Sequence, residues 1–290
     1  GEVRGRERLG DEGPDEAAGG DDHRLDRSRV PGRLVRGPRA VGKPGGTQIP
    51  GRLLEGEEVS MIGLCDGRSV RLLAPSQDHK RLLDGDGGPN TGGMGAYSPA
   101  PVVTPELHAR IMREVIHPTV EGMAADGIRY TGFLYAGIMV GADGAPKVLE
   151  FNCRMGDPET QPIMMRLKSD LVALLEAAVN GKLDQVEAEW DRRTALAVVL
   201  AAAGYPDAPQ KGAVIGALPA AADDLHVFHA GTAEQDGRTV VSGGRVLAVT
   251  ALGDSVRMAQ KRAYEAIAGI HFDGMQYRRD IGWRALDRKK

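Results

Sequence analysis

Alternation of apolar and polar residues predicts β-strands along the chain from about residue 57 onward. Residues 59–64 and 70–73 form one pair of such segments, and the Asp66-Gly67 step between them favours a hairpin. Residues 133–140 and 147–152 form a second pair around the turn-rich stretch 141–146. The pattern therefore predicts two β-hairpins in this part of the chain.

The second hairpin ends in a segment whose two faces differ in chemistry. Leu149, Phe151 and Cys153 alternate there with Val148, Glu150 and Asn152. With a period of two, the first set faces the core, and Glu150 and Asn152 point together to the other face. A carboxylate and an amide oxygen placed side by side are hard ligands of the kind that Mg²⁺ takes. The same alternation also describes the solvent face of an edge strand.

Apolar residues at helical spacing predict three amphipathic helices. The first begins at Thr104-Pro105, with threonine as the cap, and we expect it to end where Pro118 interrupts the pattern. The second covers residues 167–178 and ends near Asn180-Gly181, and the third covers residues 255–269. Between the last two helices, a domain boundary is expected near Trp190-Arg193. Beyond that boundary, four apolar segments predict strands at 195–203, 227–230, 239–241 and 245–250.

The first 53 residues differ in kind from the rest. They are rich in Gly, Arg, Asp and Pro, contain no aromatic residue and show no helical or strand period. Such a segment cannot bury enough apolar surface to offset the entropy of ordering it, so we expect it to be irregular or disordered. A basic arm for nucleic acid is the alternative, but acidic residues are interspersed with the arginines, which favours a solvated tail.

Composition narrows the class of protein. The chain has 290 residues, of which 41% are hydrophobic, and a formal net charge of −3, which argues against nonspecific nucleic-acid binding. It has two cysteines, too few for a disulfide framework, and no apolar run near the roughly 20 residues that span a bilayer. We therefore expect a reduced, cytoplasmic protein without a membrane anchor.

A glycine-rich loop at residues 87–99 is the second candidate for chemistry. Its glycines permit close backbone approach, so its N–H groups could converge on an anion. The specific side chains Asn90 and Thr91, followed by Gly92 and Gly93, argue against a plain flexible linker. A polar cluster at residues 76–81 precedes the loop. Within it, Lys80 is a candidate for steering phosphate, whereas we expect His79 to be structural.

These motifs resemble one known family. Residues 150–162, EFNCRMGDPETQP, closely resemble the signature of the phosphoribosylamine–glycine ligases, which are ATP-grasp enzymes of purine biosynthesis. Residues 89–99, PNTGGMGAYSP, resemble that family's loop residue for residue, and four later segments resemble its C-terminal domain in order: 204–206, 228–232, 243–246 and 279–282. Met155 replaces the usual leucine or phenylalanine, a volume-conserving change.

The resemblance implies an α+β chain in three parts. Residues 1–53 do not match the family, residues 54–191 correspond to the C-terminal half of an ATP-grasp domain, and residues 192–290 correspond to the small α+β C-terminal domain. Family members carry more sequence before the matching part. We therefore hypothesise that residues 1–53 are an out-of-frame translation, and we expect the chain alone to be a poor or inactive ligase.

The resemblance also implies the reaction and its residues. Glycine would be phosphorylated by ATP to glycyl phosphate, and 5-phosphoribosylamine would then displace the phosphate to give glycinamide ribonucleotide. Glu150 and Asn152 would hold Mg²⁺ or Mn²⁺. Arg154, Asp157 and Glu159 would be catalytic, with Arg154 on the transferred phosphate and the other two orienting glycine.

The same comparison assigns the nucleotide and substrate contacts. Glu58 would receive the ribose hydroxyls of ATP, Lys80 would contact its phosphates, and the loop carrying Asn90, Thr91, Gly92 and Gly93 would help to orient glycine. Two alternatives remain open from the sequence. One is another ATP-grasp carboxylate–amine ligase, and the other is a non-catalytic fragment that binds nucleotide or metal weakly.

Overall fold

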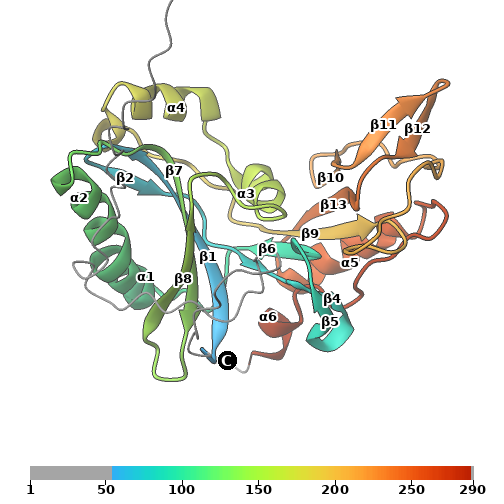
Figure 1. Cartoon of the computed structure of the whole chain (residues 1–290), viewed down its shortest axis with the longest axis horizontal. Coiled ribbons are helices and arrows are strands. Elements are labelled where there is room, and N and C mark those ends of the chain that lie inside the picture. The colour runs from blue at the N-terminus through green and yellow to red at the C-terminus, as the bar shows by residue number, and fades with distance from the viewer. Residues whose placement is uncertain (1–53, 289–290) are drawn as a thin grey trace, which may run out of the picture.

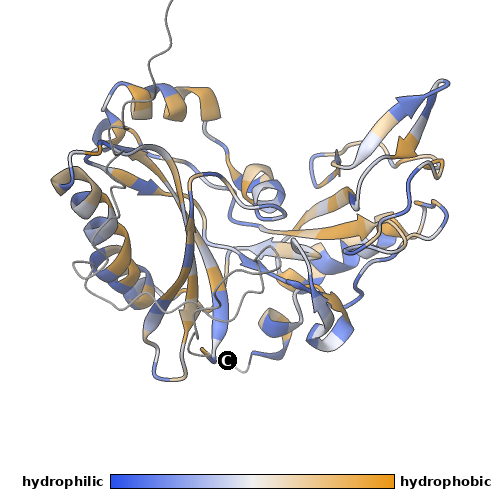
Figure 2. Cartoon of the chain, viewed as in Figure 1, coloured by the Kyte–Doolittle hydropathy of each residue, from blue (hydrophilic) through white to orange (hydrophobic). Residues whose placement is uncertain are grey.

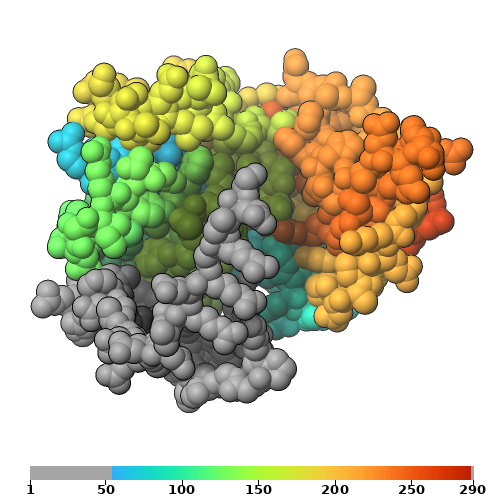
Figure 3. Space-filling model, turned by 45° about the horizontal axis from the view of Figure 1, so that its top comes forward, coloured from blue at the N-terminus to red at the C-terminus, as the bar shows by residue number. Residues whose placement is uncertain are grey.

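The computed structural model describes residues 54–288, and these form two lobes (Figure 1). The expected disorder and the out-of-frame origin of residues 1–53 lie outside the described residues. In the space-filling view, the green-to-yellow lobe and the orange lobe stand on either side of a recessed band (Figure 3). The lobes are built on two antiparallel sheets, and the candidate site residues lie where these sheets approach each other.

The first sheet has the strand order β2-β1-β7-β8. Its strands are β1 (Glu57–Asp66), β2 (Val70–Leu72), β7 (Thr131–Val140) and β8 (Pro146–Asn152). Asp66 closes the first hairpin because its Oδ1 accepts from the backbone N–H groups of Arg68 and Ser69, at 2.9 and 2.7 Å. Gly67 takes a φ of 92°, which the turn requires. Both predicted hairpins are confirmed.

One helical rod covers the outer face of this sheet. It runs through α1 (Pro105–Ile111), the π-helical segment η2 (Met112–Ile116) and α2 (His117–Ala125). Thr104 caps it by accepting from the N–H of Leu107 at 3.2 Å, as predicted. The prediction that Pro118 ends the helix is wrong. The proline sits in the first turn of α2, where a missing N–H is tolerated, and the π segment before it changes the hydrogen-bond spacing.

The hydrophobic positions of this rod, orange in Figure 2, lie on the side of the ribbon that faces the sheet. The resulting core consists of buried residues from β1, β7 and the rod: Val59, Met61, Cys65, Leu107, Ile111, Val115, Ile116, Val120, Leu134, Ala136, Ile138 and Val140 among them. Burial at roughly 25 cal/mol per Å² of apolar surface makes this the main stabilising contact of the first lobe. The helix α4 (Leu171–Val179) packs against Leu64 on the opposite face.

The second sheet has the order β10-β13-β9-β6-β3. Its strands are β3 (Gln77–Asp78), β6 (Gly95–Ser98), β9 (Thr194–Ala201), β10 (Leu225–His229) and β13 (Arg245–Gly253). The helix α5 (Val256–Ile267) buries Ala259, Ala263 and Ile267, the face that its spacing predicts. Since β6 pairs with β9, the division expected at residues 191/192 does not separate the two sheets.

Shorter elements complete the described part of the chain: β4 (Arg81–Leu83), η1 (Asp84–Asp86), β5 (Gly87–Asn90), α3 (Thr160–Arg166), η3 (Leu183–Gln185), β11 (Thr232–Gln235), β12 (Arg238–Val241) and α6 (Trp283–Asp287). The predicted helix at 167–178 begins later than expected. Asp170 caps it by accepting from the N–H of Val172 at 2.8 Å, and Leu167 ends α3 instead. Its end at Asn180-Gly181 is confirmed, with Gly181 at a φ of 67°.

A bulge in β8 alters the expected facing of its side chains. Gly137 pairs with Glu150, whereas the next residue, Ile138, pairs with Val148, so Leu149 is the extra residue. Val148 and Phe151 consequently both pack against the first core, although an uninterrupted alternation would separate them. Of the three predicted core residues, Phe151 is confirmed. Leu149 and Cys153 were placed wrongly, because Leu149 joins no core cluster and Cys153 is exposed.

We expect Phe151→Ala to lower the free energy of unfolding by about 2–3 kcal/mol, below the range for a fully buried phenylalanine because Phe151 is half-buried. Leu149→Ala should cost less, since the bulge turns Leu149 away from the core. Urea denaturation of both variants measures the difference. An equal cost for the two would contradict the bulged register.

Candidate functional site

The inner face of the first sheet collects polar side chains at one end. Glu58 and Ser60 project from β1 and Tyr135 from β7, and the pairing of β7 with β8 adds Glu150 and Asn152 to the same face. Gly137 lies between two of them, since a Cβ there would be in van der Waals contact with Glu150 Cγ at 3.4 Å and Tyr135 Cε1 at 3.5 Å. The predicted common facing of Glu150 and Asn152 is thus present, and it points toward the other candidate residues.

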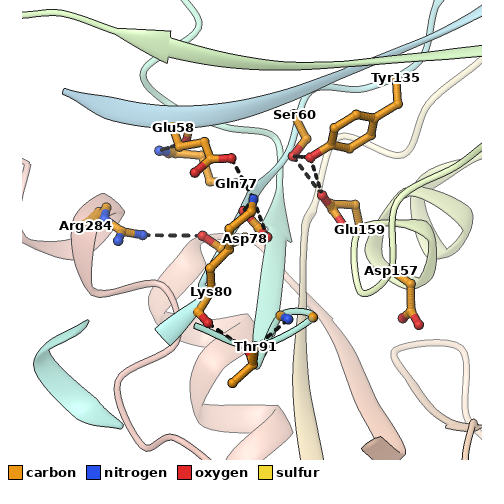
Figure 4. Close-up of polar contacts among 12 residues, drawn as sticks. Glu58, Ser60, Gln77, Asp78, Lys80, Thr91, Tyr135, Asp157, Glu159 and Arg284 are labelled. Carbon is orange, nitrogen blue, oxygen red and sulfur yellow. Dashed lines mark hydrogen bonds and ion pairs between the residues drawn. The ribbon is translucent and has the colours of Figure 1, made fainter. Parts of the chain in front are cut away.

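Lys80 joins carboxylates from different strands (Figure 4). Its Nζ lies 2.6 Å from Glu58 Oε1 and 2.9 Å from Asp78 Oδ2. Burial opposes the charge of Lys80, but Asp78 and Glu58 outweigh it and raise the lysine pKa well above its usual range. Burial raises the pKa of Glu58, with Lys80 acting against that rise and Asp78 and Glu150 adding to it. One ammonium therefore faces an excess of carboxylates.

That excess of negative charge suits a cation, although the described residues contain no cluster of three or more His, Cys, Asp or Glu side chains arranged around a metal. Glu150 and Asn152 offer two hard oxygen ligands on one face, near Glu58. Two protein ligands are enough where a metal ion also binds nucleotide phosphates, so these residues fit Mg²⁺ in that setting.

Glu159 is almost completely buried, with 2% of its surface exposed. Its Oε1 accepts hydrogen bonds from Ser60 Oγ at 2.8 Å and from the Tyr135 hydroxyl at 3.1 Å. Burial, followed by the charge of Asp78, raises the pKa of Glu159 to about 7. Gly156 makes room for this carboxyl group, because a Cβ at that position would lie 2.5 Å from its carboxyl carbon.

The glycine-rich loop is tied down by its own neighbours. The N–H of Thr91 donates to Lys80 O at 2.7 Å, that of Gly92 to the Tyr205 hydroxyl at 2.9 Å, and that of Gly93 to Thr91 Oγ1 at 3.0 Å. The N–H of Met94 donates to the His79 carbonyl at 2.8 Å. The N–H groups of residues 91–94 are each already paired, so the expectation that successive N–H groups converge on an anion is wrong for this part of the loop.

The remaining predicted residues lie nearer the surface. Asp157 is exposed in the turn before α3, and its Oδ2 accepts from Arg245 Nη2 at 3.0 Å. Arg154 is exposed and donates to the carbonyl of Met155 at 2.9 Å. Asn90 is exposed at the end of β5, opposite Arg81. The structure thus groups Glu58, Lys80, Glu150, Asn152 and Glu159 around one face, with Arg154, Asp157 and Asn90 outside that cluster.

Three residues of the cluster were not among the predicted site residues: Ser60, Asp78 and Tyr135. Asp78 fell within the polar cluster at residues 76–81 but was given no role there. Ser60 lies two positions after Glu58 in a strand, so the period of two already placed it on the same face. Tyr135 carried no signal, because nothing local indicates that β7 lies between β1 and β8.

Two further expectations concern His79 and the cysteines. Burial, with Arg284 and Arg278 nearby, lowers the pKa of His79 to about 3, and its Nε2 accepts from the N–H of Gly282 at 3.2 Å, as a neutral structural histidine would. Cys65 is buried and Cys153 exposed, and both are free thiols. No helix among residues 54–288 is long and apolar enough to cross a membrane.

Replacement of Glu159 by Gln should change how stability depends on pH. The folded protein holds the Glu159 proton up to about pH 7, whereas the unfolded chain releases it near 4.5. Between these values the folded state binds more protons, so this group makes stability fall as pH rises. We expect urea denaturation from pH 5 to 8 to show that decline in the parent chain and a flatter profile in Glu159→Gln. The exposed Glu121→Gln variant is the control, and identical slopes in all three would contradict the raised pKa.

Comparison with known proteins assigns this arrangement to a family. Residues 38–160 match the model described as phosphoribosylglycinamide synthetase, ATP-grasp (A) domain, and residues 195–284 match the C domain of the same enzyme. The first match begins 16 residues before residue 54, where the sequence motifs placed the start of the resemblance.

Curated relatives carry one name. The phosphoribosylamine–glycine ligase of Ralstonia nicotianae is 62% identical over 248 residues, which cover 86% of this chain and 59% of that protein. The enzyme of the same name from Pseudomonas aeruginosa is 57% identical over 267 residues, covering 92% of this chain and 62% of that protein. The chain thus spans about three-fifths of the length of the relatives it matches.

Solved structures agree. The phosphoribosylamine–glycine ligase from Thermotoga maritima superposes with a TM-score of 0.71 at 41% identity, covering 80% of this chain and 57% of that one. The biotin carboxylase domain of the 2-oxoglutarate carboxylase from Hydrogenobacter thermophilus, at 15% identity and a TM-score of 0.54, shares the fold alone. With the site residues inside the first matched region and β9 to α5 inside the second, the chain belongs to the phosphoribosylglycinamide synthetase family.

Proposed function

We propose that this site serves the ATP-dependent ligation of glycine to 5-phosphoribosylamine. The names of the relatives state a ligation of phosphoribosylamine and glycine for those proteins, and the matched ATP-grasp domain supports ATP as the co-substrate. The observation that supports this proposal most directly is the polar face of the first sheet, where Glu58, Lys80, Glu150 and Glu159 gather. The proposal includes a cytoplasmic location, a reducing compartment in which two free thiols persist.

The nucleotide half of the proposal rests on charge. ATP brings several negative charges to a face that already carries Glu58, Asp78 and Glu150, so Lys80 and a divalent cation are needed to offset them. Glu150 and Asn152 would hold Mg²⁺ or Mn²⁺, which when bound neutralises phosphate charge. In this proposal Glu58 receives the ribose hydroxyls and Lys80 turns from its carboxylate partners toward the phosphates.

The acceptor half rests on the two loops at the edge of this face. We assign glycine to the space between residues 90–93 and the turn at 157–159, and we assign Arg154 to the transferred phosphate. The bonds from Ser60 and Tyr135 fix the carboxyl group of Glu159, so it can orient a substrate without rearranging. Exclusion of water matters here, because glycyl phosphate would be hydrolysed in an open site.

Phosphate release from ATP tests the proposed reaction. We expect release that requires glycine and 5-phosphoribosylamine together, measured with the 290-residue chain alone and with the chain supplemented by the N-terminal part of a relative. If another carboxylate can replace glycine, or another amine can replace 5-phosphoribosylamine, in supporting phosphate release, the result would favour a different ATP-grasp ligase. Nucleotide binding without release in either preparation would favour a non-catalytic role.

The metal assignment has its own test. We expect Glu150→Gln and Asn152→Ala each to weaken Mg²⁺-dependent binding of ADP by about tenfold, equivalent to roughly 1.4 kcal/mol. Stability should change little, because both side chains face away from the first core. Isothermal titration calorimetry measures the affinity, with the exposed Asp143→Asn as the matched control. Unchanged affinity in both variants would show that these residues form only a solvent-facing edge.

A further inference from the structure

The two loops proposed to hold glycine come from distant parts of the chain and touch directly. Gly93 takes a φ of 118°, and a Cβ at that position would lie 2.5 Å from Cδ of Pro158. The glycine-rich loop therefore packs its backbone against Pro158, in the turn that also carries Asp157. A contact this close has little tolerance for relative movement of the two segments.

A single side chain from the second sheet bonds to both loops. Nη1 of Arg245 donates to the carbonyls of Gly92 at 2.8 Å, Gly93 at 3.4 Å and Asp157 at 2.6 Å. Its Nη2 donates to Asp157 Oδ2 at 3.0 Å. One guanidinium group thus bonds to three backbone carbonyls and one carboxylate. These acceptors belong to two loops, at Gly92-Gly93 and at Asp157, which are more than 60 residues apart in sequence.

The start of β13 explains why the Arg245 side chain is directed toward the two loops. Its pairing with β9 is irregular between Arg245 and Leu247, and such a bulge redirects a side chain. The neighbouring Gly244 lies under the ring of Tyr205, where a Cβ would come within 2.4 Å of Cδ2. The hydroxyl of that tyrosine accepts the N–H of Gly92. The second lobe therefore holds the loop through two side chains that lie next to each other.

An ordinary surface ion pair does not account for this arrangement. Asp157 is 49% exposed, and exposed pairs contribute about 0–1 kcal/mol. Arg245 is 22% exposed, however, and most of its bonds go to backbone carbonyls. The planar guanidinium group holds Nη1 and Nη2 in a fixed geometry, so it bonds the carbonyls and the Asp157 carboxylate together, whereas a lysine ammonium is a compact point charge.

We propose that Arg245 is a positioning residue that locks the loop at 92–93 and the turn at 157–158 into one arrangement. The effect on glycine rests on the proposed function, whereas the locking of the loops does not. Arg245 touches no reacting atom in this proposal. It acts through the two loops, from a strand of the lobe opposite the one that carries Glu150 and Asn152.

Hydrogen exchange on the 290-residue chain tests the lock without any substrate. We expect Arg245→Met to speed exchange at least fivefold in peptides covering residues 91–96 and 156–161. The matched control is Arg262→Met, which removes an arginine of the same lobe that pairs with Asp224 at 2.9 Å instead. The proposal would be overturned if both peptides of Arg245→Met exchange at the parent rate, as we expect them to do in Arg262→Met.

Kinetics in whichever preparation releases phosphate test the consequence for glycine. We expect Arg245→Met to raise the KM for glycine about tenfold with a smaller change in kcat, and added methylguanidinium to restore part of the loss in Arg245→Ala. Arg245→Lys should recover less than half of the effect. An unchanged KM alongside faster exchange would overturn the link to glycine. If neither the chain alone nor the supplemented chain releases phosphate, the proposed function fails, and the exchange experiment alone decides whether Arg245 locks the two loops.

Discussion

The pairing of β6 with β9 is the constraint on which the site depends. It attaches residues 95–98 to the sheet of the second lobe, and β3 extends the same sheet through β6. Lys80 lies two residues after β3, and residues 91–94 of the glycine-rich loop directly precede β6, so that sheet positions both. Ser76 bridges back to Ser60 on β1 through paired backbone hydrogen bonds of 2.8 and 3.1 Å. This β-bridge ties the segment that leads into β3 to β1 of the first sheet, next to the polar cluster.

The carboxyl groups of that cluster are stabilised in two different ways. Lys80 neutralises part of Glu58 and Asp78, and Glu159 is held by neutral hydroxyl donors instead of a cation. A buried carboxyl group with neutral partners favours its protonated form, which explains the direction of its pKa.

Local signals in the sequence predicted much of the fold, and non-local contacts account for what they missed. The Asp66-Gly67 turn, the Thr104 cap and the spacing of Ala259 and Ala263 each act within a few residues, and each is confirmed. The bulge at Leu149 depends on its partner strand β7, so the alternation within β8 could not reveal it. The glycine-rich loop was misjudged for the same reason. The N–H groups of Thr91, Gly92 and Met94 are satisfied by Lys80, Tyr205 and His79, whose proximity arises only in the folded chain.

The contrast between the two thiols has a practical consequence for spectroscopy. Burial raises the pKa of Cys65 to about 12, which keeps its thiolate population negligible at neutral pH. Cys153 is exposed and directly follows Asn152 at the end of β8. A maleimide dye or a nitroxide would therefore attach at one position of the unaltered chain, one residue from the candidate metal ligand. The native sequence already carries a labelling site for distance measurements to a paramagnetic Mn²⁺ ion.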